Sequence, residues 1–181
     1  DYAQALDRAV SRVLSANCSE SQISFENAVD TDYPANPDAP VDKSCNIFDP
    51  AGGALAPIKP DAILTGIKIR PTGGSSLKNI GTYDALAATG HQDMAVWFGP
   101  LTEDLCNQMN TMNGYTGAIP TAASVEAWEY GAVNAGSHWG TTIVDLGALS
   151  GKTDGCVIVP AGGDAAHLAA GYQFYHVLMA R

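Results

Sequence analysis

Apolar residues at the start of the chain repeat with the period of an α-helix. Within residues 1–17 they recur three and four positions apart, and polar residues fill the opposite side. The turn formers Asn17 and Ser19 indicate that the helix ends near Cys18. A helix of about four turns is marginal alone in water, so this one needs a surface on which to bury its stripe. The apolar positions of the stripe are Tyr2, Ala3, Leu6, Ala9, Val10, Val13 and Leu14.

The later hydrophobic patterns are shorter and predict strands. Residues 62–70 alternate between apolar and polar positions, and residues 93–99 are almost continuously apolar. Residues 170–181 alternate again, with apolar side chains on both faces, and predict a final strand. Two further candidate strands lie in residues 141–147 and 155–163, whereas residues 71–76 ("PTGGSS") predict a Gly-rich loop. Residues 20–29 fit either a short strand or a continuation of the first helix, and residues 30–43 predict a loop.

Residues 100–114 show the start and stop signals of a second helix. Thr102 is a suitable N-cap, Glu103 and Asp104 fall in the first turn, and Asn113-Gly114 ends the pattern. The order of elements predicts an α+β fold, in which the N-terminal amphipathic helix packs on an antiparallel sheet and much of the chain is loop. We expect one domain over residues 1–181, formed by the helix at 1–17 and a globular part at 18–181.

The charge of the chain limits the classes of partner that it can bind. The net charge is −10, and no Lys or Arg occurs between Lys78 and Lys152. Such a surface repels phosphate groups, so we expect no nucleic-acid partner and no docking on anionic membranes. No run of about 18 apolar residues is present, so we expect no membrane-spanning segment within these residues.

Four cysteines, Cys18, Cys45, Cys106 and Cys156, predict two disulfides in an exported protein. The chain has no C-x-x-C pair, which disfavours a zinc ribbon or a redox motif. Spacing alone does not separate the three possible pairings. We expect Cys18–Cys45 and Cys106–Cys156, because each of these bonds closes a local loop.

Familiar catalytic motifs are missing from the sequence. "GKT" at 151–153 resembles the end of a P-loop, but Leu146 stands where that motif requires Gly. Neither G-x-S-x-G nor H-E-x-x-H occurs. The four histidines, His91, His138, His167 and His176, are scattered, and His176 fits a packed or edge histidine in the last strand. We therefore expect no catalytic residue, no cofactor and no enzymatic activity.

One acidic loop offers ligands for a metal ion. Asp30, Asp32, Asp38 and Asp42 lie in a stretch stiffened by three prolines. Several carboxylates on an irregular loop suit Ca²⁺, which binds about six to eight oxygens. The alternative is a solvated acidic connection without a metal ion, because the spacing is not that of an EF-hand.

Three stretches, "SCNIFDPAGG", "VWFGPLTEDLCNQMN" and "GYQFYHVLMAR", are similar to prepilin-like proteins of proteobacteria and cover about a fifth of the chain. Together with the N-terminal helix and the loop-rich sheet domain, they resemble the soluble part of a type IV pilin or a type II secretion pseudopilin. The resemblance implies an apolar half-helix upstream of Asp1, which would be the only attachment to a membrane. It also implies a periplasmic or cell-surface protein, derived from an inner-membrane precursor, whose partners are other subunits bound through the N-terminal helix.

A secreted binding module of the carbohydrate-binding or adhesion type is the alternative function. Trp128, Tyr130 and Trp139 lie in Gly- and Ala-rich surroundings and would form a sugar platform if they are exposed. If they are buried, they belong to the core, which is the commoner place for Trp.

Overall fold

The computed structural model describes residues 2–29, 35–58, 68–77, 80, 93–123, 142–160 and 170–180. Within these residues the α-helices are α1 (Tyr2–Ser15) and α2 (Glu103–Met112), and the short 3₁₀ turns are η1 (Glu20–Gln22) and η4 (Gly147–Leu149). The strands are β1 (Lys68–Leu77), β2 (Asp93–Leu101), β3 (Thr142–Val144), β4 (Asp154–Val159) and β5 (Gly171–Met179). Both predicted helices are confirmed within two or three residues.

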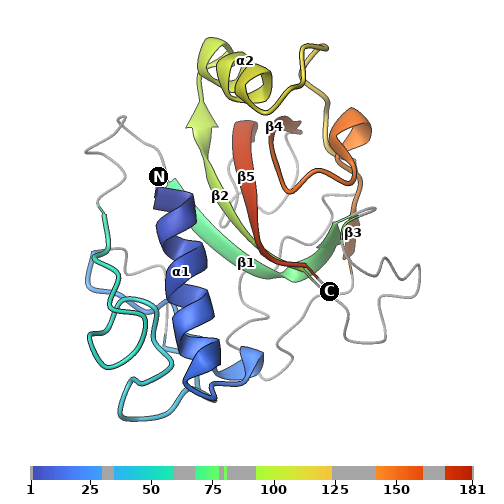
Figure 1. Ribbon diagram of the computed structural model, residues 1–181. Coiled ribbons are helices and arrows are strands. Elements are labelled where there is room, and N and C mark those ends of the chain that lie inside the picture. Colours follow the sequence, from blue (N-terminus) through green and yellow to red (C-terminus); the bar gives the residue numbers. More distant parts are fainter. Residues whose placement is uncertain are drawn as a thin grey trace.

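The five strands form one sheet in the order β3-β1-β2-β5-β4. The pairs β1–β2, β2–β5 and β5–β4 are antiparallel, so the predicted α+β fold with an antiparallel sheet is confirmed for four strands. β3 departs from the prediction, because it pairs with β1 in parallel at the edge of the sheet. Figure 1 shows α1 lying across this sheet and α2 at one end of it.

Residues of β2 and β5 alternate between two cores on opposite faces of the sheet. Trp97 and Tyr175 pack together on the face away from α1, with ring centroids 5.3 Å apart. Val96 and Phe98 point to the other face, where α1 and the loops of residues 18–58 cover them. The apolar character of β5 on both faces, as expected from the sequence, therefore reflects burial on both sides.

The predicted apolar stripe of α1 packs on the sheet. Its four buried residues are Leu6, Ala9, Val10 and Val13, and Leu14 is partly buried against the same cluster. The cluster also contains Met94 and Val96 of β2, and Ile23 and Ile47 of the following loops. Since a helix of about four turns is marginal alone in water, this tertiary burial supplies most of the stability of α1.

Both predicted disulfides are confirmed with the expected pairing. Cys18–Cys45 joins the segment just after α1 to the later part of the loop region, and Cys106–Cys156 joins α2 to β4. Beside the second bond, Asn110 forms two hydrogen bonds with the backbone of Cys156: its Nδ2 donates to the carbonyl at 2.9 Å, and its Oδ1 accepts from the N–H at 2.7 Å. α2 thereby covers part of the outer edge of β4, which would otherwise present unpaired backbone groups.

The described part of residues 18–58 forms a loop region that is fixed by backbone and side-chain hydrogen bonds. The Asn46 side chain donates to the Glu26 carbonyl at 3.0 Å and accepts from the Phe48 N–H at 2.8 Å. Gly52 is required here, because a Cβ atom at this position would lie 2.2 Å from the Asn46 carbonyl oxygen. Residues 20–29, predicted as strand or helix, instead contain η1 and one isolated β-bridge between Ser24 and Asn46.

The prediction of a Gly-rich loop at residues 71–76 is wrong, since these residues continue β1. The strand is paired with β2 on one side and with β3 on the other. Its register with β2 shifts between Thr72 and Ser75, which places Gly73 and Gly74 at an irregularity of the ladder. The two glycines thus mark a bulge within the strand rather than its end. Residues 62–67, predicted as the strand itself, lie outside the described residues.

Truncation of the α1 stripe tests this packing. Leu6 is 0% exposed, so Leu6→Ala should lower the free energy of unfolding by about 2–5 kcal/mol. Ser11→Ala on the exposed side of the same helix should change it by less than about 0.5 kcal/mol. Urea denaturation of the disulfide-bonded protein measures both values. Equal effects for the two variants would contradict the burial of the stripe.

Candidate functional site

His176 lies between two carboxylates that come from different elements. Its Nε2 atom is 2.7 Å from Oδ2 of Asp7 on α1, and its Nδ1 atom is hydrogen-bonded to Oδ1 of Asp154. Asp154 is the residue of β4 that stands directly opposite His176 in the register with β5. The imidazole is largely buried, with a residue exposure of 9%, so the three residues form a compact charged cluster between α1 and the sheet.

The protonation of this cluster follows from its contacts. The hydrogen bond to Asp154 raises the pKa of His176, burial opposes that effect, and the hydrogen bond to Asp7 raises the pKa further. Burial would raise the pKa of Asp154, but hydrogen bonds from His176 and Thr153 and the nearby positive charge bring it below its usual value. Both ring nitrogens face carboxylate oxygens, so the geometry assigns a doubly protonated ring.

An imidazolium that donates from both nitrogens has no lone pair with which to accept a proton or bind a metal ion. The cluster is therefore suited to joining α1 to the sheet rather than to catalysis. The sequence predicted a packed or edge histidine in the last strand, and the burial of His176 in a strand with neighbours on both sides agrees with the packed alternative. Sequence reasoning missed its two partners, because Asp7 lies 169 residues away and nothing in the local pattern links them.

Two adjoining hollows open on the loop region of residues 18–58. Their volumes are about 350 and 340 Å³, and Glu26, Lys43 and Asn46 line both. The Lys43 ammonium lies 3.4 Å from the Glu26 carboxylate, so this ion pair stands where the two hollows meet. Phe48 and Asp49 line the first hollow, and the second is lined by prolines and alanines together with Asn36 and Val41. Sequence reasoning missed these hollows, because the Glu26–Lys43 ion pair between them joins residues that are 17 positions apart.

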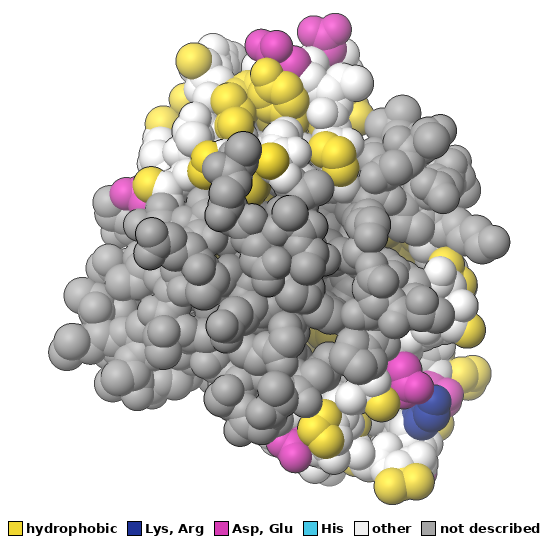
Figure 2. All heavy atoms as spheres, turned by 180° about the vertical axis from the view of Figure 1, so that it is seen from behind, with side chains coloured by type: hydrophobic (Ala, Val, Ile, Leu, Met, Phe, Trp, Pro, Cys, Tyr) yellow, Lys and Arg dark blue, Asp and Glu magenta, His cyan; other side chains and the backbone are white. Residues whose placement is uncertain are grey.

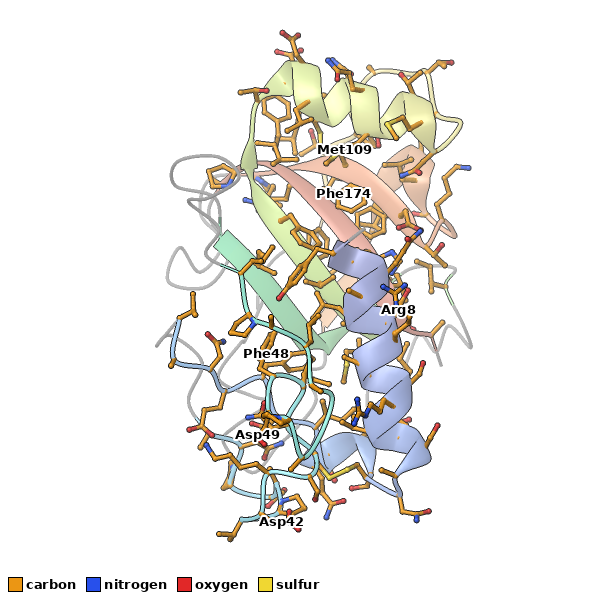
Figure 3. All side chains as sticks on the ribbon, turned by 60° about the vertical axis from the view of Figure 1, so that its left-hand side comes forward. Arg8, Asp42, Phe48, Asp49, Met109 and Phe174 are labelled. Carbon is orange, nitrogen blue, oxygen red and sulfur yellow. A yellow bond between two sulfur atoms is a disulfide. The ribbon has the colours of Figure 1, made fainter. Side chains whose placement is uncertain are left out.

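The proposed calcium ligands are only partly within the described residues. Asp30 and Asp32 lie outside them. Asp38 and Asp42 are exposed, and Figure 3 shows Asp42 at the outer end of the loop region. The Asp42 carboxylate accepts a hydrogen bond from the Ser44 N–H at 3.0 Å, a contact that lowers the pKa of Asp42. No group of three or more His, Cys, Asp or Glu suited to a metal ion occurs among the described residues, and calcium binding stays a prediction.

The remaining candidates of the sequence lie outside the described residues. These are the aromatic residues Trp128, Tyr130 and Trp139, and the histidines His91, His138 and His167. Across the ranges that the structure does describe, neither helix is long and apolar enough to cross a membrane.

The pH dependence of stability tests the His176 cluster. Because the pKa of His176 is raised on folding, its contribution is fully present below the unfolded pKa of about 6.5 and is lost as the pH rises through the folded pKa. Because the pKa of Asp154 is lowered, its contribution is present above about 3.8 and is lost as the pH falls through the folded pKa. The difference in unfolding free energy between the native protein and His176→Gln should therefore peak near pH 5.

The other histidines are common to both proteins and cancel in this difference. Each unit by which folding raises the pKa of His176 corresponds to about 1.4 kcal/mol. A difference that stays constant between pH 5 and the alkaline range would contradict a charged cluster. NMR titration of the His176 ring provides a second, direct reading of the same shift.

Calcium binding is tested by thermal unfolding in EGTA and in excess Ca²⁺. A site occupied at about 100 times its Kd should stabilise the native state by about 2.7 kcal/mol. Replacement of Asp38 and Asp42 by Asn should abolish the effect, whereas Asp49→Asn provides a neighbouring control. If the melting curve does not move, the loop is a solvated acidic connection.

Comparison with known proteins gives no relative for this chain. No protein-family model matches it, and searches of curated proteins and of solved structures found no match. Its function is therefore inferred from its own residues and fold.

Proposed function

We propose that this protein is a non-enzymatic, pilin-like or pseudopilin-like subunit of a cell-envelope filament or secretion apparatus. The observation that carries the proposal is the arrangement of α1, whose apolar stripe is buried on the sheet while its opposite side is exposed. A helix fixed in this way is rigidly attached to the globular domain. In the proposal, an apolar continuation upstream of Asp1 anchors the precursor and packs with neighbouring helices, and the loops of residues 18–58 face outward.

The disulfides support an extracytoplasmic setting for this assembly. Both bonds are compatible with an oxidising compartment, and each fixes one end of the domain: the loop region beside α1, and α2 beside β4. Export to the periplasm or cell surface is part of the proposal. The partners are then other subunits of the same kind, with no nucleic acid, as the net charge of −10 suggests.

The residues encoded upstream of Asp1 give the first test. A short basic leader followed by an apolar run of about 20 residues supports the proposal. A cleavable secretory signal directly before Asp1 contradicts it and favours the binding module.

Site-specific photo-crosslinking in the native cell gives the second test. A photoreactive residue at Ser11, on the exposed side of α1, should form crosslinks between copies of the chain within an assembled filament. Val41 provides the matched control, because it is 99% exposed but belongs to the outer loops. Absence of crosslinked oligomers from Ser11, or equal yields at the two positions, would count against assembly through α1.

The two hollows beside Lys43 favour the second candidate, a secreted binding module. The first of them combines an aromatic side chain, two carboxylates and one ammonium group, which is the kind of lining found in small-ligand sites. Binding of oligosaccharides to the native protein, lost in Lys43→Ala and Phe48→Ala but retained in Ser11→Ala, would support this function in place of the filament subunit.

A further inference from the structure

The two carboxylates that flank His176 are not held in the same way. Asp154 lies on β4, directly opposite His176 in the antiparallel pairing with β5, and its Oδ2 atom accepts a hydrogen bond from the Thr153 hydroxyl at 3.0 Å. The sheet therefore fixes this carboxylate in place. Asp7 lies in the first half of α1, and its side chain is 38% exposed. Its hydrogen bond with His176 ties this half of the helix to β5.

The His176 ring lies on the face of the sheet that α1 covers. In the register of the sheet His176 stands between Val96 of β2 and Asp154 of β4, and Val96 belongs to the core beneath α1. No histidine side chain is visible among the coloured residues in Figure 2, which shows the molecule from behind. β2 therefore offers the ring an uncharged neighbour, whereas α1 and β4 each offer one carboxylate. Asp7 and Asp154 are the charged groups of the described residues that act on the ring.

Loss of one proton changes what the ring can bind. The doubly protonated ring donates to both carboxylates, but a neutral ring has one N–H donor and one lone pair. A lone pair on Nε2 would face the Asp7 Oδ2 atom at 2.7 Å, and the two electron-rich groups would repel one another. Asp154 cannot move away without disturbing the pairing of β4 with β5, whereas the partly exposed Asp7 can turn towards water. The remaining proton therefore stays on Nδ1, and the contact with Asp7 is the one that is lost.

We propose that His176 is a pH-sensitive switch that holds the first half of α1 on the sheet. With two protons on the ring, Asp7 and Asp154 are joined through it, and the helix is closed along its whole length. When Nε2 loses its proton, Asp7 is released and residues 2–9 open more readily. The second half of α1 stays in place, because its part of the apolar stripe is buried and a disulfide lies just after the helix.

The switch is closed on the acidic side and opens on the alkaline side. The hydrogen bond to Asp7 raises the pKa of His176, so the closed helix binds the second proton of the ring more tightly than the open helix does. The resulting stabilisation is fully present below the pKa of the ring in the open state and is lost as the pH rises through the higher pKa of the closed state. In the extracytoplasmic setting proposed above, the external pH would then set how firmly α1 is held.

The tautomer of the neutral ring gives the first test. Nitrogen NMR of the native protein, recorded while the pH is raised from about 5 to about 10, shows which ring nitrogen keeps its proton. We expect the proton on Nδ1 of His176. A proton on Nε2 would overturn the proposal, because Asp7 would then keep its hydrogen bond at high pH.

Hydrogen exchange with a matched pair of variants gives the second test. Amide protection factors at Leu6 and Ala9 measure the opening of the first half of α1. In the native protein they should fall about tenfold as the pH rises through the titration of the ring, which corresponds to a contribution of about one pKa unit from Asp7. Asp7→Asn should remove this fall, because an amide can accept from Nε2–H and can also donate to the Nε2 lone pair. Asp104→Asn removes the same charge from an exposed position on α2 and should behave like the native protein.

The protection factors of the native protein and of Asp7→Asn should cross as the pH rises. Below the titration of the ring, Asp7→Asn should protect α1 less, because a neutral amide forms a weaker bond with the charged ring than a carboxylate does. Above the titration, Asp7→Asn should protect α1 more. Far-ultraviolet circular dichroism first establishes that each variant is folded.

The proposal is overturned if the native protection factors do not follow the titration of His176, or if Asp7→Asn shows the same fall as Asp104→Asn. The switch does not require assembly into a filament. The filament function therefore fails separately, because crosslinking at Ser11 in cells reports on assembly whether or not α1 opens at high pH.

Discussion

Burial of one apolar stripe of α1 is the interaction on which the rest of the structure depends. The stripe closes the core on one face of the sheet, where Val96 and Ile47 are fully buried. The Cys18–Cys45 disulfide then fixes the loop region next to the end of α1. The hydrogen bond between His176 and Asp7 joins the helix to β5. If α1 were removed, the sheet would expose an apolar face and the charged cluster would lose one of its two carboxylates.

The sequence predicts the parts of the fold that depend on local pattern. The period of α1, the capping residues of α2 and the apolar run of β2 are all visible within windows of about ten residues. The disulfide pairing agrees with the expectation that each bond closes a local loop, although spacing alone left three pairings open. By contrast, the Gly-rich segment of β1 looks like a loop until its two neighbouring strands are known, and the parallel pairing of β3 has no local signal.

The candidate sites were less predictable than the fold, because they also depend on contacts between segments that have no local signal in the sequence. The His176 cluster joins three elements, and the Glu26–Lys43 pair closes a contact between two loops. Neither can be read from spacing, since charge pairs impose no periodicity on a sequence. The exposed side of α1 is the exception, because its polar positions follow directly from the helical period.

In this fold α1 is an integral part of the folded domain. Native-state hydrogen exchange tests this most directly, because it measures the free energy of opening residue by residue. Near pH 5, where the His176 cluster is charged, the amides of Val10 and Val13 should exchange with the same free energy as those of Val96 and Tyr175 in the sheet. Exchange of the α1 amides at a much lower free energy, while the sheet stays protected, would show that the helix opens on its own and would contradict the account.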